Sequence, residues 1–338
     1  MLVILGLLLA LAGCAHRLPP TLSPSETLRW RSADGWEGPL LHYPGSGQAV
    51  MLVHGMSANH YNWDYRPEVS LAWWLQQRGW DVWIPGLRGD EGTTAPSKKA
   101  GRNWIFDDHA LLDLPAALDV IREHTGQQQV VWIGHSMGGM LLYAALSAYP
   151  ERIRAGVAIA SPGQFTVLPP LKKLLRGGGP ALGRHGRVPV ETFMRLMSPL
   201  GRMAPGMGKI SLRANMDPGL VRGLSGHALS DLPRAMTQEV VTWLRAGTLT
   251  RADGATPWIR AESPAVPVLL LAGSADWIAP AADVVAVCGT LPDCESRVLG
   301  PDGGQPHDYG HVDLVLGRDA ETTVYPIVED WLEAHGGP

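Results

Sequence analysis

Short, continuous apolar runs alternate along this chain with longer segments in which apolar side chains recur at helical spacing. Continuous runs are typical of parallel strands that are buried on both faces. The runs are residues 48–53, 80–85, 130–133, 153–160 and 266–273. Helices are expected near Ser70–Arg78, Asp108–His124 and Met140–Leu146. The pattern predicts an α/β fold, with a mostly parallel central sheet, helices on both faces, and chemistry at the carboxyl ends of the strands.

This alternation breaks over residues 163–261, which contain Gly177-Gly178-Gly179-Pro180 and short apolar pieces such as Thr192–Met197. We expect a cap inserted into a core made of residues 36–162 and 262–338. The Met, Leu and Pro residues of this stretch suit an adaptable apolar pocket, although a small core within the cap itself would explain most of them.

One apolar run ends in a motif that points to chemistry. Val130–Ile133 leads into Gly134-His135-Ser136-Met137-Gly138, and a helical apolar pattern follows. A serine on a sharp turn between a strand and a helix forms a nucleophile elbow, which lifts its hydroxyl clear of the backbone. The flanking glycines have no Cβ, so strand and helix can approach closely. Ser136 is therefore the predicted nucleophile.

A serine hydroxyl needs a general base, and the base needs an acid to orient it. Asp276 lies just past the end of the run 266–273, and His311 lies in a Gly-containing loop before the last expected helix. The order Ser, acid, His is the one that accompanies this elbow. We therefore predict a triad of Ser136, Asp276 and His311.

Other residues compete for the two partner roles. Asp283 and Asp302 are alternatives to Asp276, which is favoured because it directly terminates an apolar strand. His307 is an alternative to His311, which is favoured because it opens a His-X-Asp-Leu pattern ahead of the last helix.

A carboxylate–histidine cluster, Asp107, Asp108, His109 and Asp113, raises the alternative of a metal site. Asp107 or Asp108 is expected to cap the helix instead, with the other residues on its solvent face. Neither a metal nor another cofactor is expected.

The oxyanion that forms when an ester is attacked needs backbone donors. The run 48–53 is followed at once by His54-Gly55-Met56, so the N–H groups of Met56 and Met137 are the predicted oxyanion hole. His54 and His135 adjoin these turns, and we expect them to brace the turns by hydrogen bonds rather than to transfer protons.

Taken together, these motifs resemble the α/β-hydrolases, and most closely the lipase and esterase branch that includes the acid lipases. Acid lipases have an elbow like Gly134–Gly138, an Asp-Trp pair like Asp276-Trp277, and a His-X-Asp stretch like His311–Gly317. The resemblance covers most of residues 45–160 and 262–335. It implies an α/β-hydrolase fold with an inserted cap.

The resemblance also implies an activity. Serine at the elbow favours hydrolysis of carboxylic esters, whereas related polymer synthases have cysteine there and dehalogenases have aspartate. Small-molecule or lipid esters are the expected substrates. The chain departs from many relatives at Asp90-Glu91-Gly92, where they have Gly-His-Gly-X-Ser. An acyltransferase with the same triad and a non-catalytic lipid-binding lipoprotein are the alternative functions.

The N-terminal residues predict a location. Residues 1–13 are uncharged and apolar, with the length of a signal-peptide core rather than of a membrane span. Leu11-Ala12-Gly13-Cys14 resembles the lipobox of bacterial lipoproteins, although no Lys or Arg precedes the run. We expect a signal peptide over 1–13, a lipidated Cys14 that anchors the protein to the membrane of the cell envelope (periplasmic face or outer membrane), and a tether over 14–35. A core helix with a chance cysteine is the alternative.

Cys288 and Cys294 flank a short turn-rich loop, and in an oxidising compartment they are expected to form a disulfide, with two free thiols as the alternative. A chain of 338 residues with 45% hydrophobic residues can bury one large core that carries an insertion. Its formal charge of −4 and the absence of a basic run interleaved with aromatics argue against a nucleic-acid partner.

Overall fold

The computed structural model describes residues 18–166, 187–188, 190–191 and 214–337. Its strands are β1 (Glu26–Arg31), β2 (Glu37–Tyr43), β3 (Ala49–Val53), β4 (Asp81–Pro85), β5 (Val130–His135), β6 (Ile153–Ile159), β7 (Arg187–Val188), β8 (Leu232–Pro233), β9 (Val268–Gly273) and β10 (Cys294–Leu299). Its α-helices are α2 (Leu71–Gln76), α3 (Phe106–Asp108), α4 (Leu114–Thr125), α5 (Met137–Ala148), α9 (Pro218–His227), α10 (Arg234–Ala246), α11 (Ala281–Val285), α12 (Asp313–Leu316) and α13 (Tyr325–His335).

Eight strands form one sheet in the order β1-β2-β4-β3-β5-β6-β9-β10. From β4 to β10 all neighbours are parallel, while β1 and β2 are added antiparallel at one edge. Every residue of β3, β4, β5 and β9 is buried, which explains why these strands are continuous apolar runs in the sequence.

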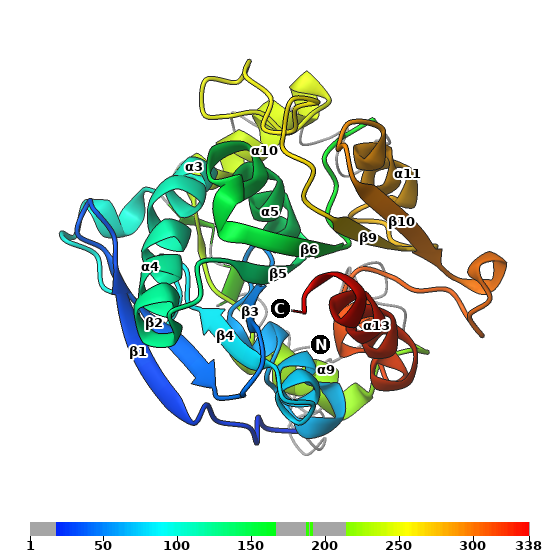
Figure 1. Ribbon diagram of the computed structural model, residues 1–338. Coiled ribbons are helices and arrows are strands. Elements are labelled where there is room, and N and C mark those ends of the chain that lie inside the picture. Colours follow the sequence, from blue (N-terminus) through cyan, green and yellow to red (C-terminus); the bar gives the residue numbers. More distant parts are fainter. Residues whose placement is uncertain (1–17, 167–186, 189, 192–213, 338) are drawn as a thin grey trace, which may run out of the picture.

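Helices cover both faces of this sheet. Figure 1 shows α4, α5 and α11 on one face, with α2 and α13 on the other. A strand–helix–strand alternation produces this arrangement because each crossover helix buries its apolar side on the sheet. The predicted α/β fold with a mostly parallel sheet is confirmed.

The prediction of a tether over residues 14–35 is wrong for residues 26–31. Glu26–Arg31 form the edge strand β1, and the Trp30 side chain is fully buried, with its indole N–H donating to the carbonyl of Gly86 at 2.9 Å. Leu28 and Trp30 alternate with polar neighbours, which is the weak pattern of an edge strand with one exposed face. The predicted signal peptide over 1–13 and Cys14 lie outside the described residues.

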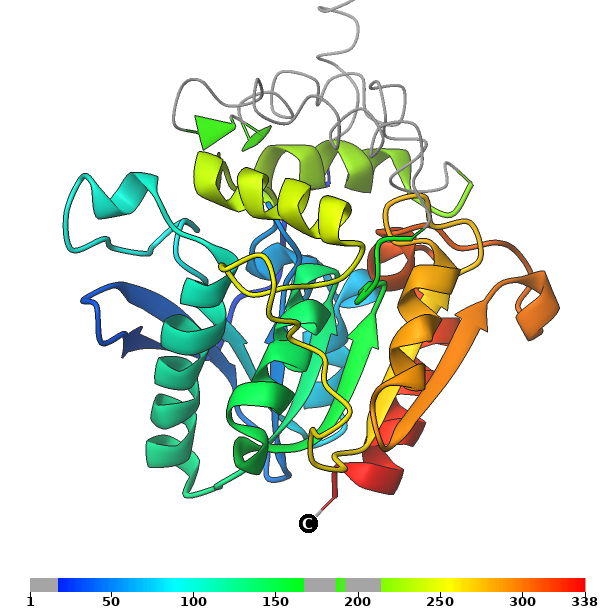
Figure 2. The same ribbon diagram turned by 90° about the horizontal axis from the view of Figure 1, so that it is seen from above.

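The chain between β6 and β9 leaves the sheet. Its described part holds α9 and α10, and Figure 2 shows both (yellow-green) lying across the end of the sheet to which the parallel strands point. The cap was predicted over 163–261, and the piece Thr192–Met197 lies outside the described residues. No helix among the described residues is long and apolar enough to cross a membrane.

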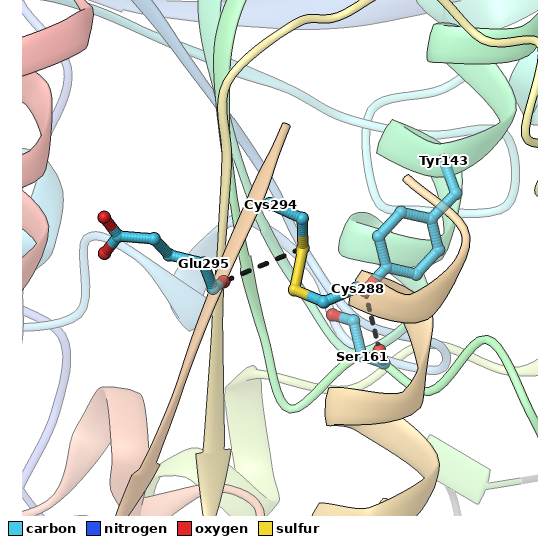
Figure 3. The surroundings of a disulfide bond; sticks show 5 residues. All are labelled: Tyr143, Ser161, Cys288, Cys294 and Glu295. Carbon is cyan, nitrogen blue, oxygen red and sulfur yellow. Dashed lines mark hydrogen bonds between the residues drawn. A yellow bond between two sulfur atoms is a disulfide. The ribbon is translucent and has the colours of Figure 1, made fainter. Parts of the chain in front are cut away.

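Cys288 and Cys294 are joined by a disulfide, with their Cα atoms 5.2 Å apart. It connects the turn after α11 to the first residue of β10, as Figure 3 shows. Nearby, the Tyr143 hydroxyl donates to the carbonyl of Ser161 at 2.9 Å and links α5 to the end of β6 (Figure 3).

Candidate active site

Ser136 occupies the sharp turn between β5 and α5. Its backbone has φ 54° and ψ −119°, a conformation that non-glycine residues rarely adopt. The Ser136 N–H donates to the carbonyl of Ile159 on β6 at 2.8 Å, which fixes the turn to the neighbouring strand. A Cβ on Gly134 would lie 2.2 Å from the backbone of Gly138, so the elbow closes only because these positions are glycine.

The structure brings the three predicted triad residues together. The Ser136 Oγ lies 3.0 Å from His311 Nε2, and His311 Nδ1 lies 2.8 Å from Asp276 Oδ2. Asp276 and His311 are buried, whereas Ser136 is partly exposed. These are the contacts that nucleophile–base–acid chemistry requires.

Asp276 is fixed by the backbone that follows β9. Its Oδ1 accepts the N–H groups of Ile278 and Ala279, both at 2.8 Å, which leaves Oδ2 for His311. The carboxylate is thereby aimed at the imidazole without any further side chain.

The loop that carries His311 is held on two sides. The Asp313 carboxylate accepts the N–H of Gly310 at 2.9 Å and the side-chain amide of Asn215 at 2.6 Å. On the other side, His135 Nε2 lies 3.0 Å from the carbonyl oxygen of His311. Asn215 was not singled out in the sequence, since nothing local marks a residue whose partner lies about a hundred positions away.

His135 is neutral, because burial lowers its pKa to about 3, helped by the neighbouring His311. A neutral ring carries one N–H, and both of its neighbours are acceptors: Nε2 lies 3.0 Å from the carbonyl oxygen of His311 and Nδ1 lies 2.9 Å from the Oδ1 of Asn62. His135 was predicted to brace the turn that it adjoins; its printed contacts are instead with Asn62 and with the loop of His311, and the Ser136 hydroxyl lies beside His311.

The competing acids and base lie apart from the three contacting side chains. Asp283 accepts the N–H and hydroxyl of Thr166, Asp302 is exposed, and His307 lies 3.5 Å from Asp319. These contacts give none of the three a place in the Ser136–His311–Asp276 chain.

In the carboxylate–histidine cluster, Asp108 behaves as the predicted cap, since its carboxylate accepts the N–H of Ile105 at 2.9 Å. The expectation that the others face solvent is wrong for His109 and Asp113, which are buried. Both carboxylate oxygens of Asp113 accept hydrogen bonds from the guanidinium of Arg88. The Nδ1 of His109 lies 3.0 Å from the Oδ2 of Asp113. A buried arginine draws these polar side chains inward, because burial without a counter-charge is costly.

The predicted oxyanion turn lies against the nucleophile. A Cβ on Gly55 would lie 3.1 Å from the Cβ of Ser136, and Met56 and Met137 both line the cavity that contains Ser136. Met56 and Met137 therefore lie on the cavity wall with the serine, and their role as an oxyanion hole stays a prediction.

His54 secures this turn through a partner that the sequence did not indicate. Its Nε2 lies 2.7 Å from Asp90 Oδ2, and its Nδ1 lies 3.0 Å from the carbonyl of Gly55. Burial lowers the pKa of His54, but the Asp90 carboxylate outweighs burial and the net pKa is raised. Asp90 also accepts the N–H of Leu87 and the hydroxyl of Ser230, so it joins the turn to the inserted segment.

A cavity of about 460 Å³ opens above the serine. Ser136 and His311 line it on the core side, and the apolar side chains of Leu224 on α9 and Trp243 on α10 line it on the side of the insertion. Its size and apolar walls fit a small or medium-sized ligand with a large apolar part.

The arrangement is that of the α/β-hydrolase fold, with Ser136 after β5, Asp276 after β9 and His311 before α12. A family model described as "alpha/beta hydrolase fold" matches residues 48–193. A thermophilic esterase from Thermogutta terrifontis superposes with a TM-score of 0.62 over 92% of this chain and 99% of that chain, at 18% sequence identity. The predicted α/β-hydrolase fold is confirmed.

Curated relatives of the chain are lipases. Lipase member K of Mus musculus is 38% identical over 120 residues, which span 33% of this chain and 30% of that protein. Lipase 3 of Drosophila melanogaster is 23% identical over 99% of this chain and 97% of that protein. The match to lipase member K thus spans less than a third of that protein, whereas the match to lipase 3 spans nearly all of it at a lower sequence identity.

Proposed function

We propose that this chain is a serine hydrolase that cleaves carboxylic esters through Ser136, His311 and Asp276. The observation that carries the proposal is the pair of contacts of 3.0 Å and 2.8 Å that links the three side chains beside an apolar cavity. Distant relatives named as lipases support the same class of reaction.

In the proposed mechanism His311 takes the proton of Ser136 as its Oγ attacks the ester carbonyl carbon. Asp276 holds the His311 tautomer and stabilises the imidazolium. The N–H groups of Met56 and Met137 stabilise the oxyanion of the tetrahedral intermediate. His311 then protonates the leaving alcohol, and water releases the acid from the acyl-enzyme by the same steps.

The cavity supports an acyl group with a substantial apolar part. Val221 and Leu224 on α9, and Val240 and Trp243 on α10, bring apolar surface toward Ser136. Transfer of such a group from water to the cavity is favourable by about 0.8 kcal/mol per methylene. Small-molecule and lipid esters are therefore the proposed substrates, and no cofactor takes part.

The test is hydrolysis of p-nitrophenyl esters from acetate to palmitate by the wild type, by Ser136→Ala and by Ser225→Ala. Ser225 also lines the cavity, but its hydroxyl donates to the carbonyl of Val221, so its variant is a matched control. We expect Ser136→Ala to lose at least about 10³-fold in kcat while Ser225→Ala stays within a few fold of the wild type. Equal rates for Ser136→Ala and the wild type would overturn the proposal and favour a lipid-binding protein.

An acyltransferase would use the same acyl-enzyme with an alcohol in place of water. Adding a long-chain alcohol to the assay and measuring the ratio of new ester to free acid distinguishes the two. We expect free acid to dominate; ester as the main product would reassign the protein as a transferase.

We also propose that the protein is anchored in the cell envelope through a lipidated Cys14, after removal of residues 1–13. The sequence Leu11-Ala12-Gly13-Cys14 supports this location, and a disulfide between Cys288 and Cys294 suits an oxidising compartment. Labelled palmitate should enter the wild type and not Cys14→Ser, which should leave the membrane fraction. An unchanged membrane fraction for Cys14→Ser would contradict the anchor.

A further inference from the structure

A second cluster of chemically capable side chains lies at the opposite end of the sheet from Ser136. Glu26 is the first residue of β1 and lies directly across from His42 on β2, while His124 lies in the last turn of α4. The cluster adjoins Asp81, the first residue of β4, whereas Ser136 follows the last residue of β5. Figure 1 shows α4 lying against the β1–β2 edge, where these elements meet.

The three side chains present their ligand atoms to one point. His42 Nδ1 lies 3.3 Å from Glu26 Oε2, His124 Nε2 lies 3.9 Å from the same oxygen, and all three ligand atoms lie within 4.8 Å of one another. A Zn²⁺ ion with N and O ligands at about 2.0 Å in a tetrahedron separates those atoms by about 3.3 Å. One pair already has this spacing, the second pair is 3.9 Å apart, and no pair is more than 4.8 Å apart.

Two of the three side chains are free to close the remaining gap. The side chains of Glu26 and His124 are 49% and 38% exposed, so both can rotate toward His42. The His42 side chain is only 5% exposed, and its ring is stacked on Trp83 with centroids 3.6 Å apart. His42 is thus the buried member of the cluster, and the other two side chains lie at the surface beside it, with the His124 ring edge-on to His42 and Trp83.

The far side of His42 is arranged as in many metal sites. Its Nε2 lies 2.7 Å from Asp81 Oδ1, and Asp81 also accepts the N–H of Gly45 and the indole N–H of Trp83. A carboxylate oxygen is an acceptor, so at this distance the Nε2 of His42 carries the N–H that it donates to Asp81. The lone pair of His42 is then on Nδ1, which faces Glu26 and His124. A carboxylate that holds the second nitrogen of a ligating histidine is a recurrent feature of zinc sites.

We propose that Glu26, His42 and His124 bind a divalent transition-metal ion of the Zn²⁺ class, with Asp81 orienting His42 and water completing the coordination. Two imidazoles and one carboxylate suit Zn²⁺ and its neighbours, and not Ca²⁺ or Mg²⁺, which prefer oxygen ligands. The bound ion joins the edge strand β1 to the end of α4. Its role is structural, because the cluster and the Ser136 site lie at opposite ends of the sheet.

The sequence offered no sign of this site, because its ligands are far apart at positions 26, 42 and 124 and form no spaced motif. From the sequence we expected no metal. This proposal departs from that expectation.

The test is calorimetric titration of EDTA-treated, tag-free protein with Zn²⁺. We expect the wild type to bind one Zn²⁺ ion per chain and to give no heat with Ca²⁺. His124→Gln should bind Zn²⁺ at least tenfold more weakly, because removing a residue that only orients a ligand already lowers metal affinity about 10–100-fold. His227→Gln is the matched control, because His227 is also exposed in the last turn of its helix, α9. It should bind Zn²⁺ like the wild type.

Two further readouts guard against a folding artefact. Zn²⁺ should raise the melting temperature of the wild type and of His227→Gln but not that of His124→Gln. Ester hydrolysis should be the same for all three, which separates this proposal from that of the serine site. Absence of Zn²⁺ binding by the wild type, or equal affinity in His124→Gln, would overturn the site.

Discussion

At the scale of single residues, the elbow depends on what is missing from its neighbours. Ser136 has a backbone φ of 54°. The strands and the helix around it approach so closely that Gly134 and Gly138 have no room for a Cβ atom. A Cβ on Gly138 would lie 2.0 Å from the carbonyl oxygen of Val53 on β3, which is a backbone atom that cannot rotate away. The conformation of the nucleophile is therefore secured by the rigidity of the sheet.

Gly138→Ala is expected to lower the free energy of unfolding by about 3 kcal/mol or more, because the sheet and α5 must separate to admit the methyl group. Gly226→Ala is the matched control: Gly226 lies on α9, and nothing is within 4 Å of a Cβ built there. There alanine should stabilise the protein by up to about 1 kcal/mol through helix propensity. Urea denaturation measures both, and similar effects of the two variants would contradict the close-packing account.

In the proposed mechanism Asp90 is a positioning residue, because it contacts His54, which in turn contacts the carbonyl of Gly55 in the proposed oxyanion turn. Asp90→Asn keeps the size of the side chain but removes the charge that raises the pKa of His54. We expect kcat to fall about 10–100-fold with KM nearly unchanged, since the oxyanion donors act mainly in the transition state. Asp302→Asn, at an exposed position, is the control and should match the wild type.

The same pair makes a pH-dependent contribution to stability. The folded pKa of His54 is raised above its ordinary 6.5, so the folded state binds the extra proton and the contribution is complete below about pH 6.5. It is lost as the pH rises through the folded pKa. In thermal melts between pH 6 and 10, Asp90→Asn should not show this loss of stability. If the melting temperature of the variant fell as steeply with pH as that of the wild type, the His54–Asp90 pair would not be the source of the loss.

At the scale of elements, a buried acid fixes α10 to the core. Glu239 on α10 accepts the N–H of Phe106 at the start of α3 at 2.7 Å, and no described residue donates a hydrogen bond to its Oε1. Burial, with help from Asp107 and Asp108, raises the pKa of Glu239 from 4.5 to about 8. Near neutral pH the carboxyl is therefore largely protonated.

Glu239→Gln is expected to make the protein more stable at alkaline pH. Between about pH 4.5 and 8 the folded state keeps the Glu239 proton that the unfolded state has released, so the wild type loses stability as the pH rises and reaches its minimum above pH 8. Glutamine still accepts the Phe106 N–H and has no charge to bury. At pH 8.5 the variant should exceed the wild type by roughly 1–3 kcal/mol, and at pH 5 by little.

Thermal melts from pH 5 to 9 measure this difference, with Glu333→Gln, exposed on α13, as the control. Asp64 has its pKa raised by burial to about 7 and acts in the same direction, so the comparison of variant with wild type is needed to isolate Glu239. An identical pH dependence in Glu239→Gln would contradict the assignment.

The elements that could be predicted from the sequence are those whose cause is local. Strands buried on both faces, such as β3 and β9, are continuous apolar runs, and the elbow is a compact motif. The edge strand β1 was missed because it alternates weakly, with only Trp30 fully buried. The same limit applies to the site: Ser136, Asp276 and His311 end or follow recognisable elements, whereas Asn62, Asp90 and Asn215 have roles that only the tertiary fold creates.

At the scale of the whole molecule, the core and the insertion divide the site between them. The sheet supplies Ser136, Asp276 and His311 from loops at one end, and α9 and α10 lie across that end (Figure 2). Under the proposed function, the core determines the reaction, while the insertion determines the space left for the acyl group. A change in the wall on the side of the insertion should alter the choice of substrate without altering the chemistry.

Ala228→Phe tests this division. Ala228 ends α9, is buried and lines the cavity, so a phenyl ring there occupies space that a long acyl chain would need. We expect kcat/KM for p-nitrophenyl esters of long chains to fall at least tenfold relative to the acetate, because the lost burial of about two methylenes already amounts to more than 1.4 kcal/mol. Ala246→Phe, exposed at the end of α10, adds the same ring outside the cavity and should keep the wild-type profile. If both variants kept that profile while Ser136→Ala remained inactive, the triad would stand and the acyl chain would have to bind elsewhere than between the core and the insertion.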